Sequence, residues 1–519
     1  MASAIADLVL HDGAVLGHPE SDAVAIAGGR IAAHGSFGAL RPMMGSKSRL
    51  IRLGGRTVAP GFIDCHLHFL EAAAVNSGPH LGRCRGIGQL LDELRLAAAK
   101  TPPGNWLRAF GCDESLLYEH RGPTRDELDR SASRNPLRLR HQTLHASWLN
   151  SRAIKLLGLE RADFIPPAGA WLERDASGRL TGFVVGMEEW LTRNLPVVTS
   201  AELEARARMM SRELAAAGVT SFTDATVRNG PDEFKLYALL VQGGAIRQRV
   251  SLMLGAPHLD SAFAVRATAE RAGFRLGGVK FVERAESERE LATLGRRAAR
   301  ALALGLDCCF HVTELPELES AVSAFERAKT SLVKKETGAT LRLEHAALIT
   351  PDYLERIAAA GAWVITNPGF LHFRAAKYLA DPGLIPHLYR AHSLSEAGIA
   401  LAAGTDAPVT PAKPLVAIAA AVSRQGLEGQ DLAPDERLSI GEAFSLFTSA
   451  AARISRLEAG ELTVGAHADL IVLPKNPLTL SPAELINLPV DITIIGGQVV
   501  YERGRPEFAH SSSAELFST

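Results

Sequence analysis

Two histidines lie two residues apart at the end of an apolar run near the start of the chain. They are His66 and His68, in the segment PGFIDCHLH at residues 60–68. Side chains two positions apart on a β-strand point to the same side of the strand. Because imidazole nitrogen is a common ligand of zinc and related ions, this pair could hold one metal ion at a strand end. The pair alone does not establish such a site, since histidines at this spacing also occur as core or surface residues.

Four more residues with chemistry of this kind stand in or at the end of later β-type runs. They are Lys280, His311, His345 and Asp406. In a closed parallel barrel, the carboxyl ends of all strands form one ring. Histidine and carboxylate ligands together suit zinc or a similar divalent ion. The sequence therefore predicts one metal centre, at which the histidine pair meets residues from distant parts of the chain.

Eight β-type runs, separated by helical patterns, can position these residues. Their ranges are 57–68, 218–225, 249–255, 278–283, 306–312, 341–346, 362–368 and 399–408. Lys280 and His311 are 311 − 280 = 31 residues apart, and His311 and His345 are 345 − 311 = 34 residues apart. One strand, one helix and their loops take about 30 residues. Eight such repeats predict an α/β fold with a (β/α)8 TIM barrel.

β-structure is also predicted at both ends of the chain. The segments AVAIAGGRIAAHG and DITIIGGQVVYERG each place a Gly-Gly turn between two apolar runs, which is a hairpin signal. We expect a small β-sandwich domain built from residues 1–58 and 459–519, and a barrel over residues 59–458. The first two barrel runs are 218 − 68 = 150 residues apart, which predicts an insertion at 70–200 that forms a lid or substrate wall.

Composition excludes several classes of protein. Lys plus Arg is 56 and Asp plus Glu is 57, and the net charge of −1 gives no electrostatic case for binding nucleic acid. No run of about 18 apolar residues is present, so we expect no membrane span, and the N-terminus lacks the features of a signal peptide. The five cysteines are irregularly spaced without a Cys-x-x-Cys motif, which favours reduced thiols and a cytoplasmic protein. If the chain oligomerises, a homodimer is the expected assembly.

Several motifs resemble those of a known family. The segments PGFIDCHLHF, LRLEHA, GTDAP and GAHADLIVL are similar to motifs of the amidohydrolase superfamily. The segments GNWLRAFGCDES, PTRDELDRSASRNP, LHASWLNSRAI and RDASGRLTGF resemble the branch that contains N-substituted formamide deformylase, amidohydrolase family 3. This resemblance implies a distorted (β/α)8 barrel, a β-sandwich formed by both termini, and metal-dependent hydrolysis.

The resemblance also implies roles for individual residues. By position, the metal ligands would be His66, His68, His311, His345 and Asp406. Lys280, in GVKF, matches a lysine that carbon dioxide carboxylates and that bridges two metal ions. His145, in LHASWLN, matches a histidine of the insertion that is expected near the substrate. The implied cofactor is a divalent metal, with zinc expected, as one ion or two.

The expected reaction is hydrolysis of a non-peptide C–N bond in an amide, a formamide or a cyclic amide. A divalent ion lowers the pKa of bound water to about 7, which supplies hydroxide at neutral pH. Asp406 would accept the proton of the water and later deliver it to the leaving nitrogen. Trp363, Asn367 and Phe370 could line the mouth of the site and bind substrate, although packing of a loop explains them equally well.

Two alternatives stay open. His311 and Glu314 form a His-x-x-Glu motif that resembles the one in mononuclear deaminases, where the glutamate carries a proton to a ring nitrogen. The same Glu314 also suits the start of a helix, where acidic residues are favourable. The second alternative to amide hydrolysis is a protein that keeps the barrel of this family but has lost catalysis.

Overall fold

A computed structural model describes residues 5–75, 78–143, 145–196, 199–331 and 338–505 of the chain. The chain forms two compact units, one of Met1–His68 with Ser211–Thr519 and the other of Phe69–Met210. The first unit contains the candidate metal ligands and is described first. In the described part of the chain, no helix is both long and apolar enough to span a bilayer.

An eight-stranded sheet of parallel strands forms the centre of the first unit. Its strands in spatial order are β19 (Ala400–Ala403), β18 (Trp363–Thr366), β17 (Leu341–His345), β16 (Cys308–Val312), β15 (Arg275–Phe281), β14 (Arg249–Gly255), β13 (Val219–Asp224) and β7 (Phe62–Leu67). Neighbouring strands are also consecutive along the chain, as in a singly wound barrel. The expected (β/α)8 architecture is therefore confirmed.

The two outer strands of this sheet, β7 and β19, lie against each other and nearly close the barrel. The backbone N–H of Asp406 donates to the carbonyl oxygen of His66 at 2.7 Å. The buried carboxylate of Asp64 accepts from the backbone N–H of Thr405 at 3.0 Å and from its hydroxyl at 2.5 Å. Gly404 permits this approach, because a Cβ there would lie 2.5 Å from the Cβ of His66.

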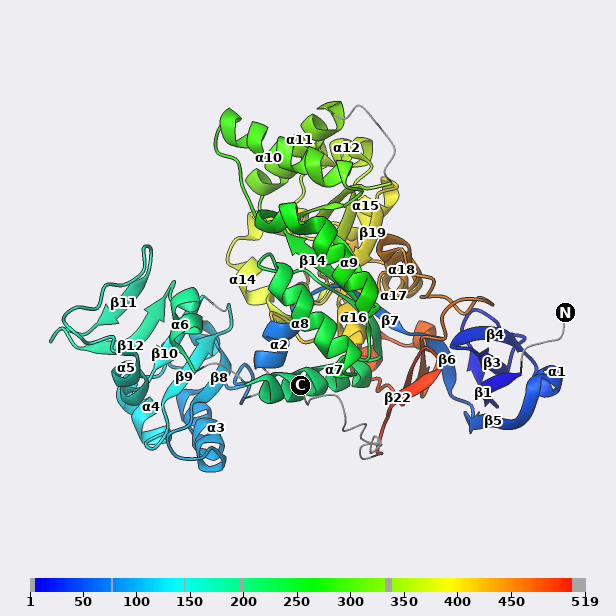
Figure 1. Cartoon of the computed structure of the whole chain (residues 1–519), viewed down its shortest axis with the longest axis horizontal. Coiled ribbons are helices and arrows are strands. Elements are labelled where there is room, and N and C mark those ends of the chain that lie inside the picture. Colours follow the sequence, from blue (N-terminus) through cyan, green and yellow to red (C-terminus); the bar gives the residue numbers. More distant parts are fainter. Residues whose placement is uncertain (1–4, 76–77, 144, 197–198, 332–337, 506–519) are drawn as a thin grey trace. The chain divides into compact units, whose positions relative to one another are not determined.

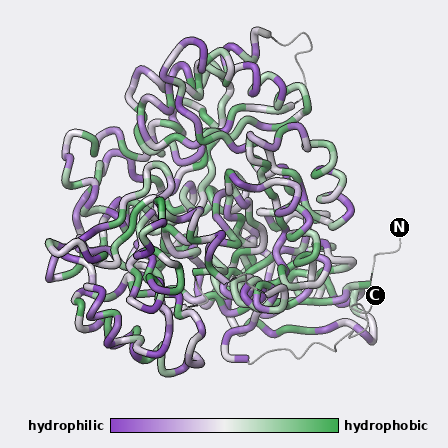
Figure 2. Tube along the Cα trace, turned by 60° about the vertical axis from the view of Figure 1, so that its left-hand side comes forward, coloured by the Kyte–Doolittle hydropathy of each residue, from purple (hydrophilic) through white to green (hydrophobic). Residues whose placement is uncertain are grey.

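Helices on the outside of the barrel follow most of its strands (Figure 1). They include α8 (Pro231–Gln242), α9 (Ala262–Ala272), α10 (Glu288–Ala303), α11 (Leu315–Ser331), α12 (Pro351–Ala360) and α16 (Pro414–Ser423). Hydrophilic residues run along the outer helices, coloured purple in Figure 2. On α10, for example, Leu294, Ala298 and Leu302 are buried at positions four apart, which is the spacing of one helix face.

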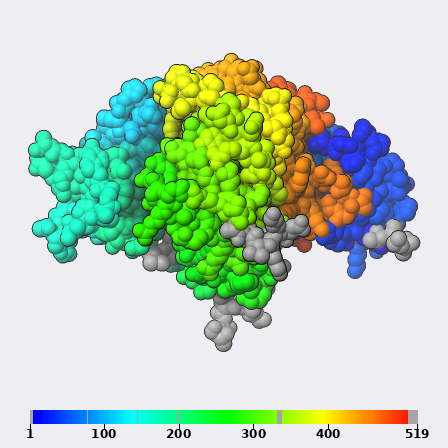
Figure 3. Space-filling model, turned by 90° about the horizontal axis from the view of Figure 1, so that it is seen from above, coloured from blue at the N-terminus to red at the C-terminus, as the bar shows by residue number. Residues whose placement is uncertain are grey.

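Strands from both ends of the chain build two further sheets in the same unit. One contains β4 (Arg30–Gly35), β3 (Ala23–Ala27), β1 (Ala6–His11) and β5 (Met44–Arg52). The other contains β2 (Ala14–Val15), β6 (Thr57–Pro60), β20 (Leu470–Leu473), β21 (Ile492–Ile495) and β22 (Gln498–Glu502). Apolar residues of both sheets share one core, with Leu8 and Ile26 from the first and Leu470 and Ile494 from the second. In Figure 3 the blue N-terminal segment lies directly against the orange segment that follows the barrel.

The run predicted at 57–68 contains two strands of different sheets. Residues 57–60 form β6 next to β20, and the barrel strand β7 begins at Phe62. Gly61 stands between them, and a Cβ there would lie 2.3 Å from the side chain of Thr220. The predicted limits of the sandwich domain stay a prediction, and residues 1–4 and 506–519 within them lie outside the described residues.

The second unit contains a five-stranded sheet and its own core. Its strands in spatial order are β11 (Trp171–Arg174), β12 (Leu180–Val185), β10 (Ala146–Leu149), β9 (Leu137–His141) and β8 (Leu107–Cys112). Helices α3 (Ile87–Lys100), α4 (Arg125–Ser131) and α5 (Ser151–Leu157) are also part of this unit. Leu90 and Leu94 of α3 pack with Leu107 and Leu139 of the sheet. The function expected for the insertion, as a lid or substrate wall, remains a prediction.

Candidate metal centre

Four histidines and one aspartate from distant strands meet at the carboxyl ends of the barrel strands. His66 lies near the end of β7 and His68 directly follows that strand, while His311 and His345 lie at the ends of β16 and β17. Asp406 follows β19. His66, His345 and Asp406 are buried, and His68 and His311 are half-buried. The structure therefore brings together the side chains that the sequence places at separate strand ends.

Distances between these side chains suit a shared ion. Potential ligand atoms of His66, His68 and Asp406 all lie within 4.8 Å of one another. Nε2 of His68 is 3.0 Å from Oδ1 of Asp406, and Nε2 of His66 is 3.6 Å from the same oxygen. Nε2 of His345 is 3.1 Å from Nδ1 of His311, and the rings of His66 and His345 are 4.6 Å apart. The five side chains thus form one cluster, which we call the ligand ring.

The backbone turns sharply at two of these positions. His345 has φ +70° and Asp406 has φ +57°, in the left-handed region that residues other than glycine seldom adopt. Such backbone conformations cost free energy and persist only where the surrounding structure holds them in place. Here they lie where β17 ends and just beyond β19, at the two positions that supply His345 and Asp406 to the ring.

Electrostatics keeps the ring in the protonation state that a metal requires. Burial lowers the pKa of His66, His311 and His345, so these imidazoles are neutral and can donate a lone pair. Burial alone would raise the pKa of Asp406, but the imidazole of His68, 3.0 Å from its carboxylate, and the other nearby histidines hold that pKa below its ordinary value. Neutral imidazoles and an ionised carboxylate are the ligand forms that zinc takes.

Three ring histidines have their Nδ1 atoms bound by residues that the sequence analysis did not single out as partners. Nδ1 of His66 is 2.5 Å from Oε2 of Glu344, Nδ1 of His68 is 2.8 Å from the hydroxyl of Thr226, and Nδ1 of His345 is 2.8 Å from Oδ1 of Asn367. Partners of this kind fix the tautomer and orientation of metal-binding histidines. Glu344 precedes His345 within the LRLEHA motif, so a charged residue in a buried strand was the available signal.

Lys280 lies on β15 with its side chain buried. Its Nζ has no hydrogen-bond partner among the described residues. Burial lowers the pKa of this amine below its ordinary value. A neutral amine is the form that reacts with carbon dioxide, so the surroundings of Lys280 suit the expected carboxylation.

The donor set fits a divalent ion. Besides Nζ of Lys280, the buried atoms Nε2 of His66 and Oδ1 of Asp406 have no hydrogen-bond partner within the described ranges. Buried polar atoms are normally paired, and each exception needs an explanation. Two atoms that each offer a lone pair and face each other at 3.6 Å, with no proton to share between them, are explained by a cation that would bind both.

Of the residues predicted to bind substrate, Phe370 and Asn367 both contact His345 of the ligand ring. The ring of Phe370, in α13 (Gly369–Phe373), stacks on His345 at 6.3 Å. Asn367 is fully buried, and its amide binds both His345 and the carbonyl oxygen of Gly404 at 2.8 Å. The geometry therefore gives Asn367 a positioning role.

Trp363 requires a correction. It is the first residue of β18, so it lies at the opposite end of the barrel from the ring. The guanidinium of Arg456 lies 5.3 Å from the centre of its indole. The sequence argument gave Trp363 and Asn367 the same direction from their even spacing, but it ignored the length of the strand that separates them.

Two further predicted catalytic residues, Glu314 and His145, are exposed. Glu314 is exposed, directly before α11, and its backbone N–H donates to the carboxylate of Glu317 at 3.1 Å. This position is the one expected if Glu314 serves only to begin a helix. His145 is exposed and lies directly before β10 in the unit Phe69–Met210, where its carbonyl oxygen accepts from the backbone N–H of Gly186.

Comparison with known proteins assigns the family. The sequence profile of the amidohydrolase family matches residues 49–501, which is most of the chain. The chain belongs to the amidohydrolase family. This amidohydrolase is 27% identical over 537 residues to N-substituted formamide deformylase of Arthrobacter pascens, an alignment that covers 93% of this chain and 95% of that protein.

Solved structures share the fold of this amidohydrolase. An uncharacterized metal-dependent hydrolase from Pyrococcus furiosus is 25% identical with a TM-score of 0.69, over 91% of this chain and 100% of that one. One from Pyrococcus horikoshii OT3 is 23% identical with a TM-score of 0.71, over 92% and 99% of the two chains. The protein is accordingly a metal-dependent hydrolase of carbon–nitrogen bonds other than peptide bonds.

Proposed function

We propose that this amidohydrolase cleaves the C–N bond of a small amide, with an N-substituted formamide as the first substrate class to test. The observation that carries the proposal is the buried ligand ring beside the unpartnered amine of Lys280. The name of the Arthrobacter pascens relative, N-substituted formamide deformylase, supports this substrate class.

The ligand ring and Lys280 would hold the metal, with zinc as the expected ion. His66, His68 and Asp406 form one half of the set, and His311 and His345 form the other. Lys280, once carboxylated, would add carboxylate oxygens to this donor set. A divalent ion bound there would lower the pKa of a water molecule to about 7 and supply a nucleophile at neutral pH.

Asp406 is proposed to carry the proton. Its carboxylate is ionised, buried and within 3.0 Å of Nε2 of His68. As the water oxygen bonds to the carbonyl carbon, Asp406 accepts the water proton. It returns that proton to the nitrogen as the C–N bond breaks, so that a formamide and water yield formic acid and an amine, and the acid then releases its proton to become formate. His145 remains proposed as a substrate contact.

The deaminase alternative depends on Glu314, which is exposed directly before α11 and three residues beyond the proposed ligand His311. A carboxylate at a helix start needs no catalytic role, so amide hydrolysis is the reaction proposed here, and the assay below includes amino-heterocycles to test the alternative.

The five cysteines are free and buried, which supports the proposed cytoplasmic location in a reducing compartment.

The proposal is tested by measuring metal content and hydrolysis together. Purified protein is assayed with N-alkylformamides, N-acyl amines and amino-heterocycles, and its metal content is measured by plasma mass spectrometry. We expect formamide or amide turnover, and Lys280→Ala should lose at least one metal ion per chain and most of its rate. Full metal content and full rate in Lys280→Ala would contradict the two-ion site, and turnover of amino-heterocycles alone would contradict amide hydrolysis.

A further inference from the structure

An ion pair lies inside the barrel directly beneath the ligand ring. Arg342 and Glu344 alternate along β17 with Leu341 and Leu343, so the two charged side chains share one face of the strand. The side chain of Arg342 is 2% exposed and that of Glu344 is fully buried. Nε of Arg342 donates to Oε1 of Glu344 at 3.0 Å. Barrel interiors are usually filled by branched apolar residues, so this pair requires an explanation.

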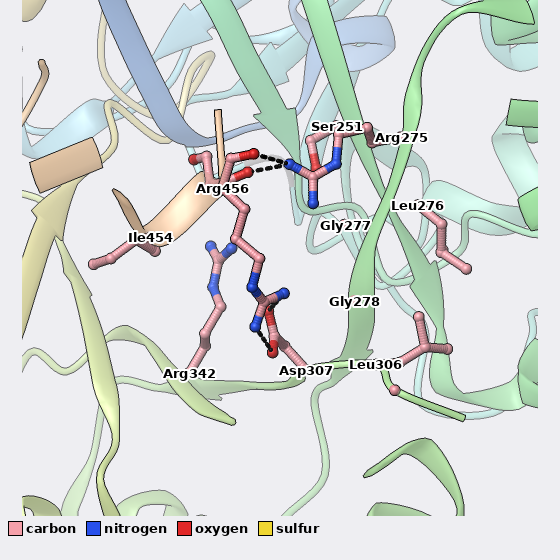
Figure 4. Close-up of a pocket in the computed structure, with 12 residues that line it drawn as sticks. Ser251, Arg275, Leu276, Gly277, Gly278, Leu306, Asp307, Arg342, Ile454 and Arg456 are labelled. Atoms are coloured by element: carbon pink, nitrogen blue, oxygen red, sulfur yellow. Dashed lines mark hydrogen bonds and ion pairs between the residues drawn. The ribbon is translucent and has the colours of Figure 1, made fainter. Parts of the chain in front are cut away.

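Stability is a weak explanation for such a pair. Removing two charges from water costs several kcal/mol each, and well-packed apolar residues can often replace a buried ion pair without loss of stability. Arg342 also borders a cavity of about 20 Å³ at the amino-terminal ends of the strands, near the Asp307–Arg456 pair (Figure 4). That volume holds about one water molecule, so the cavity is too small to bind a substrate.

Contacts made by the pair point toward the metal ligands. The second carboxylate oxygen of Glu344 lies 2.5 Å from Nδ1 of His66. Nη2 of Arg342 donates to the carbonyl oxygen of Cys65, the residue before His66, at 3.3 Å. The pair therefore holds both the imidazole of His66 and the backbone of β7 next to it.

His66 differs from the other ring histidines in the charge of its partner. Thr226 and Asn367 bind His68 and His345 through neutral groups, whereas Glu344 is a carboxylate. A carboxylate accepts the Nδ1 proton of His66, which leaves Nε2 without a proton on the side that faces Asp406. A charged acceptor also makes the imidazole a more basic ligand.

We propose that the Arg342–Glu344 pair is a positioning device for metal binding, which sets the tautomer, orientation and ligand strength of His66. Glu344 acts through His66, and Arg342 compensates the charge of Glu344 and fixes its direction. This inference depends on the metal centre of the proposed function, and it adds residues that do not themselves contact the metal.

Double variants separate this role from a structural one. Arg342→Met/Glu344→Leu removes both charges and the acceptor for His66, while Arg342→Met/Glu344→Gln removes both charges but keeps an acceptor. A matched control is Arg249→Met/Asp469→Leu. It removes another ion pair, together with the hydrogen bond that Asp469 accepts from the backbone N–H of Gly496. The readouts are zinc affinity of the full-length protein by chelator competition and the unfolding midpoint of the metal-free protein.

We expect the Leu variant to bind zinc about 10- to 100-fold more weakly than wild type, with a smaller loss in the Gln variant. Its metal-free unfolding midpoint should fall no further than that of the control, whose zinc affinity should stay within about threefold of wild type. Four results would each overturn the proposal. They are unchanged zinc affinity in the Leu variant, equal losses of zinc affinity in the Leu and Gln variants, an equal loss of zinc affinity in the control, and failure of the Leu variant to fold. Failure of wild type to bind zinc at all would instead overturn the metal centre itself.

Discussion

Asp406 has the strongest combination of position and charge in the ligand ring. Its ionised carboxylate lies 3.0 Å from His68 and 3.6 Å from His66, within the barrel mouth where the four histidines meet. A group in this position can both bind a cation and carry a proton. The two roles can be separated only if metal content is measured beside the rate.

Asp406→Asn tests the proton transfer. Asparagine keeps an oxygen ligand and similar size but cannot accept the water proton, so kcat should fall by about 10²- to 10⁴-fold. The measurement is kcat on the best amide substrate, normalised to bound metal. A variant that retains metal and more than a tenth of the wild-type rate would show that another group carries the proton.

Glu314→Gln tests the other acidic residue that the sequence suggested. Glu314 is exposed directly before α11, and if its role is only to begin that helix, we expect kcat and metal content within about twofold of wild type. Steady-state kinetics on the same substrate gives the answer. A hundredfold loss of kcat with normal unfolding would restore the deaminase-type role.

Spacing and strand position sufficed to predict the ligand ring, but not the contacts that orient it. His66 and His68 show their shared direction in the sequence, and a barrel must bring strand ends together. The pairing of His66 with Glu344 crosses the barrel interior between strands 278 residues apart, and no local pattern gives that distance. The prediction that Trp363 lines the mouth was wrong for a related reason. Even spacing gives the direction in which a side chain points, but not the end of the barrel at which it lies.

Among the elements, the contact between β7 and β19 matters most for the site. These strands carry or precede three ligands, and they approach closely where Gly404 faces His66. The repeat of strand and helix predicted both strands. It did not predict that residues 57–60 belong to a different sheet, because one apolar run can continue through a glycine from one sheet into the next.

Gly404→Ala tests this contact. A Cβ at position 404 would lie 2.5 Å from the Cβ and 2.6 Å from the backbone nitrogen of His66, so the strands must move apart. We expect a loss of about 1–3 kcal/mol in the free energy of unfolding, together with weaker metal binding. Denaturant titration measures the first quantity and chelator competition the second.

A matched control is Gly441→Ala in α17 (Ile440–Ser445), where a Cβ would meet no atom within 4 Å. Alanine in a helix should leave stability unchanged or raise it by about 0.5–1 kcal/mol. Equal stability of the two variants would contradict the close approach at Gly404.

At the scale of the whole molecule, both ends of the chain build the sandwich beside the barrel that carries the ring. β6 leads directly into β7, and β20 pairs with β6, so the first ligand strand follows a strand that the C-terminal segment holds in place. The hairpin pattern in the sequence at both termini predicted this arrangement. The insertion Phe69–Met210 is a separate unit with its own sheet, and propensity patterns do not give the position of its His145 relative to the ring.

The central claim is that residues distant in sequence hold a divalent metal at the carboxyl ends of the barrel strands. Anomalous X-ray diffraction at the zinc edge, on crystals of the active zinc-loaded protein, tests this claim most directly. The account predicts one or two anomalous peaks about 2.0–2.3 Å from ligand atoms of the ring, with extra density on Nζ of Lys280 if two are present. Active protein without an anomalous peak within coordination distance of His66, His68, His311, His345 or Asp406 would contradict it.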